Sequence, residues 1–257
     1  MARHSATVLA RFALAMMLFG SVSATAVASP AAPAPAPGAT FNQDDWSTDA
    51  SWDDSGSTDV AWADDGSADA GYAQDGNSVW VPTYMQQRNL SCEYAAAVIA
   101  MAGFGVWVNE YDFDGMVGWS DNPHWGYRGN ITGWWGNTDD YGVYASALAP
   151  AIRNFGFWAE EFYAQGDFAA LTNRIDAGSP VIVWLGLWGD TSFYDYTSDG
   201  SRYKLASGMH VVVAYGYDSG GVWVSDPAHG TKHYYDWGTF MTYWNVMDGM
   251  GLAVGPA

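Results

Sequence analysis

The stretch that decides the fold is QQRNLSCEYAAAVIAMAGFG, which runs from Gln86 to Gly105. It contains no proline and is rich in alanine after a serine, so it predicts a helix that begins at Cys92 and ends near Gly103. Cys92 is the only cysteine in the chain. The first turn of a helix presents unpaired N–H groups, which favour a thiolate. The stretch therefore predicts a reactive thiol, with a buried and inert cysteine as the alternative.

Two glutamines precede this thiol on the loop that leads into the helix. An amide beside a nucleophile can donate a hydrogen bond to the oxyanion that forms when a carbonyl is attacked. Gln86 is the candidate for this donor, and Gln87 is its rival. For both, the simpler interpretation is a solvated loop residue.

A second stretch, HVVVAYGYDSGGVWVSDP at residues 210–227, predicts two β-strands joined by a turn. A three-residue loop at positions 218–220 would place Gly220 in the left-handed conformation that this loop type requires. A two-residue loop would instead turn the second strand over. The position of Gly220 favours the three-residue loop.

The three-residue loop determines which side chains of the hairpin share a face. In that register Asp226 lies opposite Val212, on the same face as His210 and about 6–7 Å along the strand. A carboxylate there can reach an imidazole nitrogen and orient the ring. We therefore predict that Cys92 is a nucleophile, His210 its base and Asp226 the group that orients the base.

The rest of the domain shows helical patterns first and strand patterns later. Helices are predicted at residues 143–155 and 168–177, and strands at 180–187, 209–217 and 222–225. This order favours an α+β fold over an alternating α/β sheet.

Several stretches together resemble the bacteriocin-processing cysteine peptidases (cysteine peptidase family thirty-nine) and their standalone relatives. The stretch around Cys92, AGSPVIVWL at 177–185 and HVVVAYGYDSGGVWVSDPAHG at 210–230 are similar to that family's nucleophile segment and later half. SDNPHWGYRGN and YGVYASALAPAIRNFGF, at 120–130 and 141–157, are similar to its standalone secreted branch. The resemblance covers about residues 80–245.

The resemblance implies a papain-like fold, in which N-terminal helices pack on a C-terminal antiparallel sheet. It also implies a cysteine peptidase with Cys92 as nucleophile, His210 as general base, Asp226 as orienting acid and Gln86 as oxyanion donor. One departure concerns the residue after the nucleophile, which is Gly in many relatives and Glu93 here. An acid beside a thiol raises the pKa of that thiol.

The first 28 residues have the features of a signal peptide: a basic start, a short apolar run and Ala26-Val27-Ala28. The apolar run is shorter than the about 20 residues that a spanning helix needs. We therefore expect a secreted or extracellular protein without a membrane span, with attachment at the cell surface as a further option. Residues 79–257 form the predicted peptidase domain.

Residues 29–78 are expected to form a disordered linker. A Pro/Ala run is followed by three acidic ten-residue repeats, STDASWDDSG, STDVAWADDG and SADAGYAQDG, each with one aromatic residue. Such repeats cannot bury a core. A calcium site or a pro-segment is the alternative.

We predict that amides in 29–78 exchange with solvent almost without protection, and that the mature chain begins after Ala28. Hydrogen exchange and N-terminal sequencing measure these two properties. Protection comparable to that of the predicted strands would favour the calcium or pro-segment interpretation.

The chain has 28 acidic and 9 basic residues, a formal net charge of −19. Nucleic acids and anionic membranes are bound through basic patches, so this balance argues against both. His229 and His233 have a spacing that suits zinc only on a helix, and their segment predicts a loop and a strand. We expect a peptide or protein substrate, a monomer, and no cofactor or metal. The alternative function is a catalytically weak or inactive module that binds a cell-surface peptide or carbohydrate.

Overall fold

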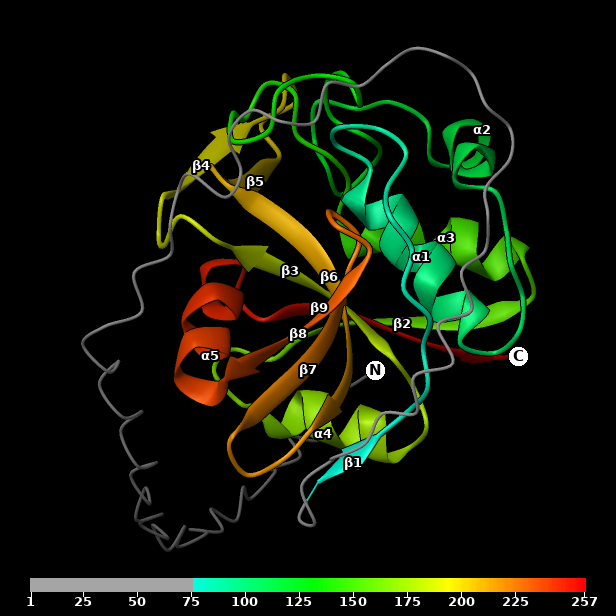
Figure 1. Ribbon diagram of the computed structural model, residues 1–257. Coiled ribbons are helices and arrows are strands. Elements are labelled where there is room, and N and C mark those ends of the chain that lie inside the picture. Colours follow the sequence, from blue (N-terminus) through cyan, green and yellow to red (C-terminus); the bar gives the residue numbers. More distant parts are fainter. Residues whose placement is uncertain (1–75) are drawn as a thin grey trace, which may run out of the picture. The chain divides into compact units, whose positions relative to one another are not determined.

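The computed structural model describes residues 76–257 (Figure 1). The predicted signal peptide and nearly all of the predicted linker lie outside the described residues. The first element is a short strand, β1 (Asn77–Ser78), which lies just before the predicted domain start at Val79.

The described residues contain helices and strands in the order that the sequence analysis predicted, with additions. The helical elements are α1 (Cys92–Ala102), η2 (Glu110–Phe113), α2 (Asp114–Val117), α3 (Ala145–Asn154), α4 (Ala169–Asp176) and α5 (Trp237–Val246). The longer strands are β2 (Phe157–Tyr163), β3 (Val181–Gly186), β4 (Ser192–Tyr196), β5 (Arg202–Ala206), β6 (Met209–Tyr217), β7 (Gly221–Asp226), β8 (Thr231–Asp236) and β9 (Met250–Pro256). The predicted helices correspond to α1, α3 and α4, and the predicted strands to β3, β6 and β7.

One large antiparallel sheet organises the domain. Its strand order is β2-β9-β3-β6-β7-β8, with β1 paired to β6. β4 and β5 form a separate two-stranded sheet. Strand β6 is therefore central, and side chains on it are fixed by neighbours on both sides.

Helices cover both faces of this sheet (Figure 1). Val211 and Val213 of β6 belong to the apolar core shared with α1 and α3. Val212 and Ala214 point the other way, into the core shared with α4 and α5. The alternation follows from the two-residue period of a strand. The predicted α+β architecture, with early helices packed on a later antiparallel sheet, is confirmed.

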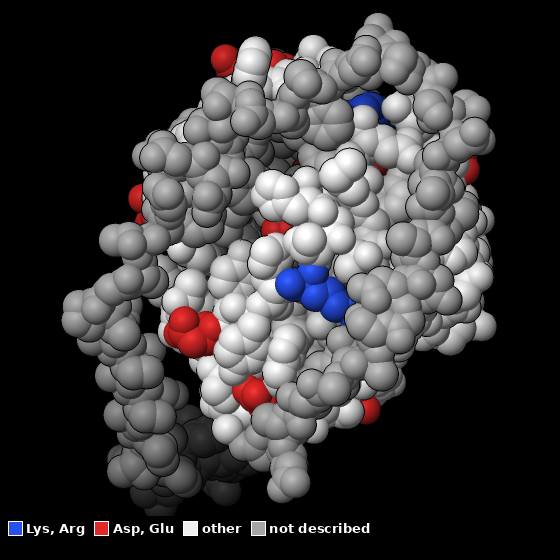
Figure 2. All heavy atoms as spheres, viewed as in Figure 1, with Lys and Arg blue, Asp and Glu red and all other residues white. Residues whose placement is uncertain are grey.

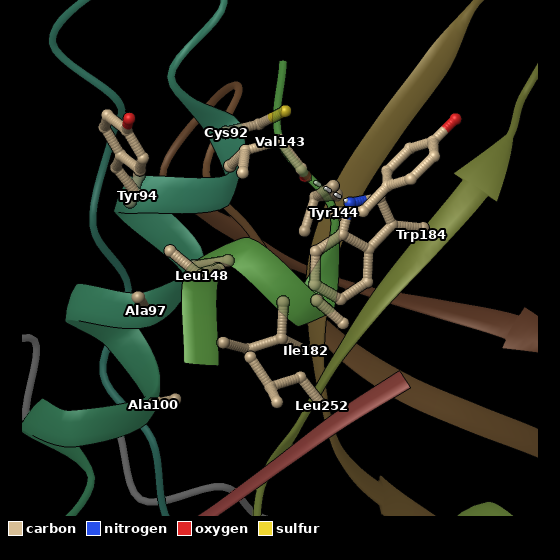
Figure 3. Packing of buried hydrophobic residues seen from close by; sticks show 14 of the residues in the cluster. Cys92, Tyr94, Ala97, Ala100, Val143, Tyr144, Leu148, Ile182, Trp184 and Leu252 are labelled. Carbon is tan, nitrogen blue, oxygen red and sulfur yellow. Dashed lines mark hydrogen bonds between the residues drawn. The ribbon is translucent and has the colours of Figure 1, made fainter. Parts of the chain in front are cut away.

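Helix α1 lies deep in the domain because its side chains are small. All eleven of its residues are buried, and five of them are alanine. Ala97 and Ala100 face the apolar side chains of Leu148 and Ile182 in the core (Figure 3). A helix that is apolar on every side is stable only when it is enclosed, so its first residue, Cys92, is held in a fixed place.

Two features of the described residues are relevant to a membrane: the charge of the surface and the length and apolar character of the helices. Charged side chains lie scattered among uncharged ones on the face shown in Figure 2. Within residues 76–257, no helix combines the length and the apolar character that a membrane crossing requires.

Candidate active site

Cys92 is the first residue of α1, as predicted. Its sulfur lies at the N-terminal end of the helix, near Val143 (Figure 3). The preceding Ser91 does not cap the helix with its side chain. Instead, its hydroxyl donates to the carbonyl of Arg88 over 3.0 Å and accepts from the Arg88 N–H over 3.2 Å, so it closes the loop before the helix.

The hairpin that carries His210 and Asp226 differs from the prediction at its tip. Strand β6 ends at Tyr217 and β7 begins at Gly221, so three residues connect them as predicted. The pairing at the tip is different, because Tyr217 pairs with Val222 and not with Gly221. The backbone of Gly220 is also not in the left-handed region, contrary to expectation. A bulge between Ala214 and Gly216 then shifts the register.

The bulge restores the predicted alignment nearer the site. Beyond it, Val213 pairs with Ser225, so the next positions along the strands are Val212 and Asp226. Asp226 and His210 consequently lie on the same face. Nε2 of His210 and Oδ1 of Asp226 are 2.7 Å apart, and both residues are buried.

The surroundings of Asp226 favour its ionised form. Burial alone would raise the pKa of this carboxyl, but the charge of His210 and its hydrogen bond outweigh burial and hold the pKa below its usual value. The backbone N–H of Ala228 also donates to Oδ1 over 2.8 Å. The contact occupies Nε2 of the imidazole and leaves Nδ1 for another partner.

Cys92 lies beside the same part of β6. Burial is the largest influence on the pKa of the thiol and raises it, whereas the backbone N–H of Val211, the residue after His210, acts to lower it. Burial and the neighbouring Glu93 carboxylate act in the opposite direction and are stronger, so the pKa of Cys92 is well above its usual value. The helix start therefore does not by itself lower the pKa of Cys92 below its usual value.

Glu93 is the nearest acid to this thiol. Its side chain is fully buried, and its Oε2 accepts a hydrogen bond from the Cys92 sulfur over 3.4 Å. Its Oε1 accepts from the backbone N–H of Val143 over 2.9 Å. Burial raises the pKa of Glu93 to about 7. The sequence indicates an acid next to the thiol but gives no sign of the contact with Val143.

Gln86, the predicted oxyanion donor, has a buried side chain in the loop before α1. Its Nε2 donates to the carbonyls of Arg88 and Asn89 over 2.8 and 2.9 Å, and its Oε1 has no hydrogen-bond partner in the described structure. The backbone N–H of Gln86 donates to the carbonyl of Pro227 over 2.8 Å, which joins the Cys92 loop to the Asp226 segment. Gln87, the rival, is half-buried and uses its backbone N–H to bind Glu110.

A charge network that the sequence analysis missed also holds this loop; Arg88 and Glu110 in it are buried, and Asp114 is exposed. Nε of Arg88 lies 3.2 Å from the Glu110 carboxylate, and Nη1 lies 2.7 Å from that of Asp114. Removal of one partner from such a network leaves an uncompensated charge, so these residues position the loop. No local pattern reveals them, because the partners are 22 and 26 residues apart.

The segment before α3 ties the two halves of the site together. Leu90 donates from its N–H to the carbonyl of Ile131, and the hydroxyl of Tyr127 donates to the carbonyl of Leu90. The indole of Trp135 donates to the carbonyl of Met209, the residue before His210, over 2.7 Å. The segment thus contacts both the cysteine loop and the histidine strand.

Residues 76–257 contain no group of three or more His, Cys, Asp or Glu side chains that could hold a metal ion. His233 lies on strand β8, where its Nε2 is 2.8 Å from the Thr231 hydroxyl. The helical spacing that would suit zinc does not apply to a strand.

Residues 79–252 match the model of the Peptidase_C39 like family. A C39-like peptidase from Bacillus anthracis is similar in structure at 19% identity, with a TM-score of 0.61, over 72% of this chain and 99% of that one. No curated protein matches the sequence.

Two transporter-associated peptidases are more distant in structure. A double glycine motif protease from an AMS/PCAT transporter, solved with its leader peptide, shares 17% identity over 70% of this chain and 95% of its own, with a TM-score of 0.44. The peptidase domain of Streptococcus ComA shares 15% identity over 68% and 98%, with a TM-score of 0.44. The match of the family model to residues 79–252 shows that the chain belongs to the C39-like peptidase family of cysteine peptidases.

Proposed function

We propose that Cys92, His210 and Asp226 form a catalytic triad that hydrolyses peptide or isopeptide bonds. The observation that carries this proposal is the buried pair of His210 and Asp226, whose Nε2 and Oδ1 atoms are 2.7 Å apart. Strand β6, which carries His210, packs against α1, which begins at Cys92. A nucleophile, a base and an orienting acid are the groups that acyl transfer to a thiol requires.

The proposed reaction gives the two nitrogens of the His210 imidazole different roles. Nδ1 of His210 takes the thiol proton while the sulfur bonds to the substrate carbonyl carbon. The imidazolium then gives that proton to the leaving amine as the C–N bond breaks, and a thioester remains. Water hydrolyses the thioester, with the same nitrogen accepting its proton and returning one to the sulfur. Asp226 holds the tautomer and stabilises the imidazolium.

The oxyanion requires donors at the carbonyl oxygen. The first N–H groups of α1 have no carbonyl partner within the helix, and we propose that the N–H of Cys92 is one of these donors. Gln86 is the proposed side-chain donor, and its Nε2 must release the carbonyl of Arg88 or Asn89 to serve, because both of its hydrogens are engaged.

A second function is favoured by one specific observation, the burial of Cys92 against the Glu93 carboxyl, whose Oε2 accepts from the sulfur over 3.4 Å. A sulfur held as a thiol suits a catalytically weak module that binds a cell-surface peptide or carbohydrate.

For both functions we propose that the protein is exported, on the basis of the composition of its first 28 residues. N-terminal sequencing of the mature chain tests this proposal.

We expect the full chain to cleave members of a peptide library. Cys92→Ala should lower the cleavage rate by about 1,000-fold or more, because it removes the only thiol in the chain. Mass spectrometry of the products measures the rate and the bond cut. Equal cleavage by the variant would remove Cys92 from the mechanism. Binding of a library member without cleavage by either protein would support the second function.

A further inference from the structure

The side chain of Glu93 occupies a space that the backbone provides for it. It enters from α1 and reaches the segment before α3, where Oε1 accepts the Val143 N–H over 2.9 Å. Gly142 has a φ of +137°, and a Cβ there would lie 1.9 Å from Oε1. Only glycine leaves room for the carboxylate at this position, so its second oxygen is held in place toward the Cys92 sulfur, 3.4 Å away.

Among the charged groups around the sulfur, the Glu93 carboxylate has the largest effect on the pKa of the Cys92 thiol. Asp226, from β7, adds a weaker negative contribution to the Cys92 thiol, and His210, from β6, favours the ionised form of Glu93. The remaining titratable groups that interact with the pair are tyrosines, whose pKa values are raised by burial, so they are neutral: Tyr94, Tyr127, Tyr141 and Tyr144.

We propose that Glu93 is a positioning residue that controls the protonation of Cys92: its ionised carboxylate accepts the S–H hydrogen bond and holds the sulfur as a thiol, and loss of this charge removes that restraint. The proposal rests on the same site as the proposed function. It concerns the thiol alone, however, so that it can be tested without any peptide cleavage.

A sulfur and a carboxylate that share this contact titrate as a coupled pair. Below the pKa of Glu93, which is about 7, the acid is neutral, and thiolate forms as the pH rises. Above that pH the dominant form is thiol beside carboxylate. Its minor tautomer, thiolate beside carboxylic acid, carries the same number of protons, so the fraction of thiolate stops rising with pH. The second deprotonation must then overcome the repulsion between two anions.

The test is the rate of alkylation by iodoacetamide, in which the thiolate sulfur bonds to carbon and iodide leaves. In the wild-type full chain, the rate should rise up to about pH 7 and then level off over about one pH unit or more. In Glu93→Gln, which keeps an acceptor for Val143 but has no charge, the rate should continue to rise. The two proteins should react alike at about pH 6 and differ by about tenfold at about pH 8.

Glu160→Gln is the control, because Glu160 lies on β2, an edge strand of the sheet, where it pairs with Arg174 over 2.9 Å. It should retain the level region whatever it does to stability. A wild-type rate that rises through about pH 8 as for an ordinary thiol would overturn the proposal, even if Glu93→Gln failed to fold. Parallel profiles for wild type and Glu93→Gln would overturn it as well. A peptidase that needs Cys92 but shows parallel profiles would refute this inference and leave the proposed function intact.

Discussion

Asp226→Asn is expected to lower peptide turnover by about 1,000- to 10,000-fold while the domain stays folded. The amide keeps the shape of the side chain but removes the negative charge that lies 2.7 Å from Nε2 of His210. Its NH2 group can also donate toward that nitrogen, which favours a proton on Nδ1 and blocks the nitrogen proposed to face the thiol. The imidazolium that forms during the reaction then has no stabilising anion.

Turnover and thermal unfolding of the same preparation measure this prediction. Asp218→Asn is the control: Asp218 lies at the tip of the same hairpin, where its carboxylate accepts from the N–H groups of Gly220 and Gly221. That change should reduce stability and leave turnover near the wild-type level. If Asp226→Asn kept turnover within about tenfold of wild type, Asp226 would have no orienting role.

Gly142→Ala is expected to lower the free energy of unfolding by roughly 2–5 kcal/mol. Part of the loss arises because the backbone, at φ +137°, is strained for any residue with a Cβ. The rest arises because the new methyl group would lie 1.9 Å from Oε1 of Glu93. That side chain would have to move and release the N–H of Val143 in a buried place.

Denaturant unfolding separates the two causes. Gly156 has a φ of +86°, and no atom lies within 4 Å of the point that a Cβ would occupy there. Gly156→Ala should therefore cost only the backbone strain, about 1–2 kcal/mol. In a Glu93→Ala background, Gly142→Ala should cost less than it does alone, because the clash is gone. Strict additivity of the two changes would show that the glycine does not serve Glu93.

The sequence predicted the bounds of an element best where neighbouring residues determine them. The start of α1 at Cys92 and both ends of β6 follow from alanine content and from a β-branched run bounded by glycine. The pairing at the hairpin tip differed from the prediction because the same residues can pair with or without a bulge in β6. The difference in energy between the two pairings depends on contacts such as that of the Tyr234 hydroxyl with Asp218, which no local pattern contains.

Helix α5 escaped prediction for a related reason. Its sequence, WGTFMTYWNV, is aromatic and β-branched, and such residues favour strands when taken alone. Asp236 caps it by accepting from the N–H of Thr239, and Phe240 and Trp244 pack on the far face of the sheet. Tertiary packing outweighs intrinsic preference there.

The contact between His210 and Asp226 and the place of Cys92 at the start of α1 were predictable, and the surroundings of the sulfur were not. Residue types and spacing suffice to select Cys92, His210 and Asp226, because a thiol, an imidazole and a carboxylate each have few rivals in suitable places. The resting state of the sulfur depends on enclosure and on the contact between Glu93 and Val143, which are 50 residues apart. Neither the degree of enclosure nor such a contact is visible in a local pattern.

The main-chain hydrogen bond from Gln86 to Pro227 opposes movement of the helical layer relative to the sheet. It links the loop before α1, which belongs to the helical layer, with the end of β7, which belongs to the sheet. A displacement of the helices relative to the sheet would have to break this bond before it could move Cys92, the proposed nucleophile, away from His210, the proposed base. The two layers are thus coupled beside the proposed catalytic residues by a main-chain bond as well as by side-chain packing.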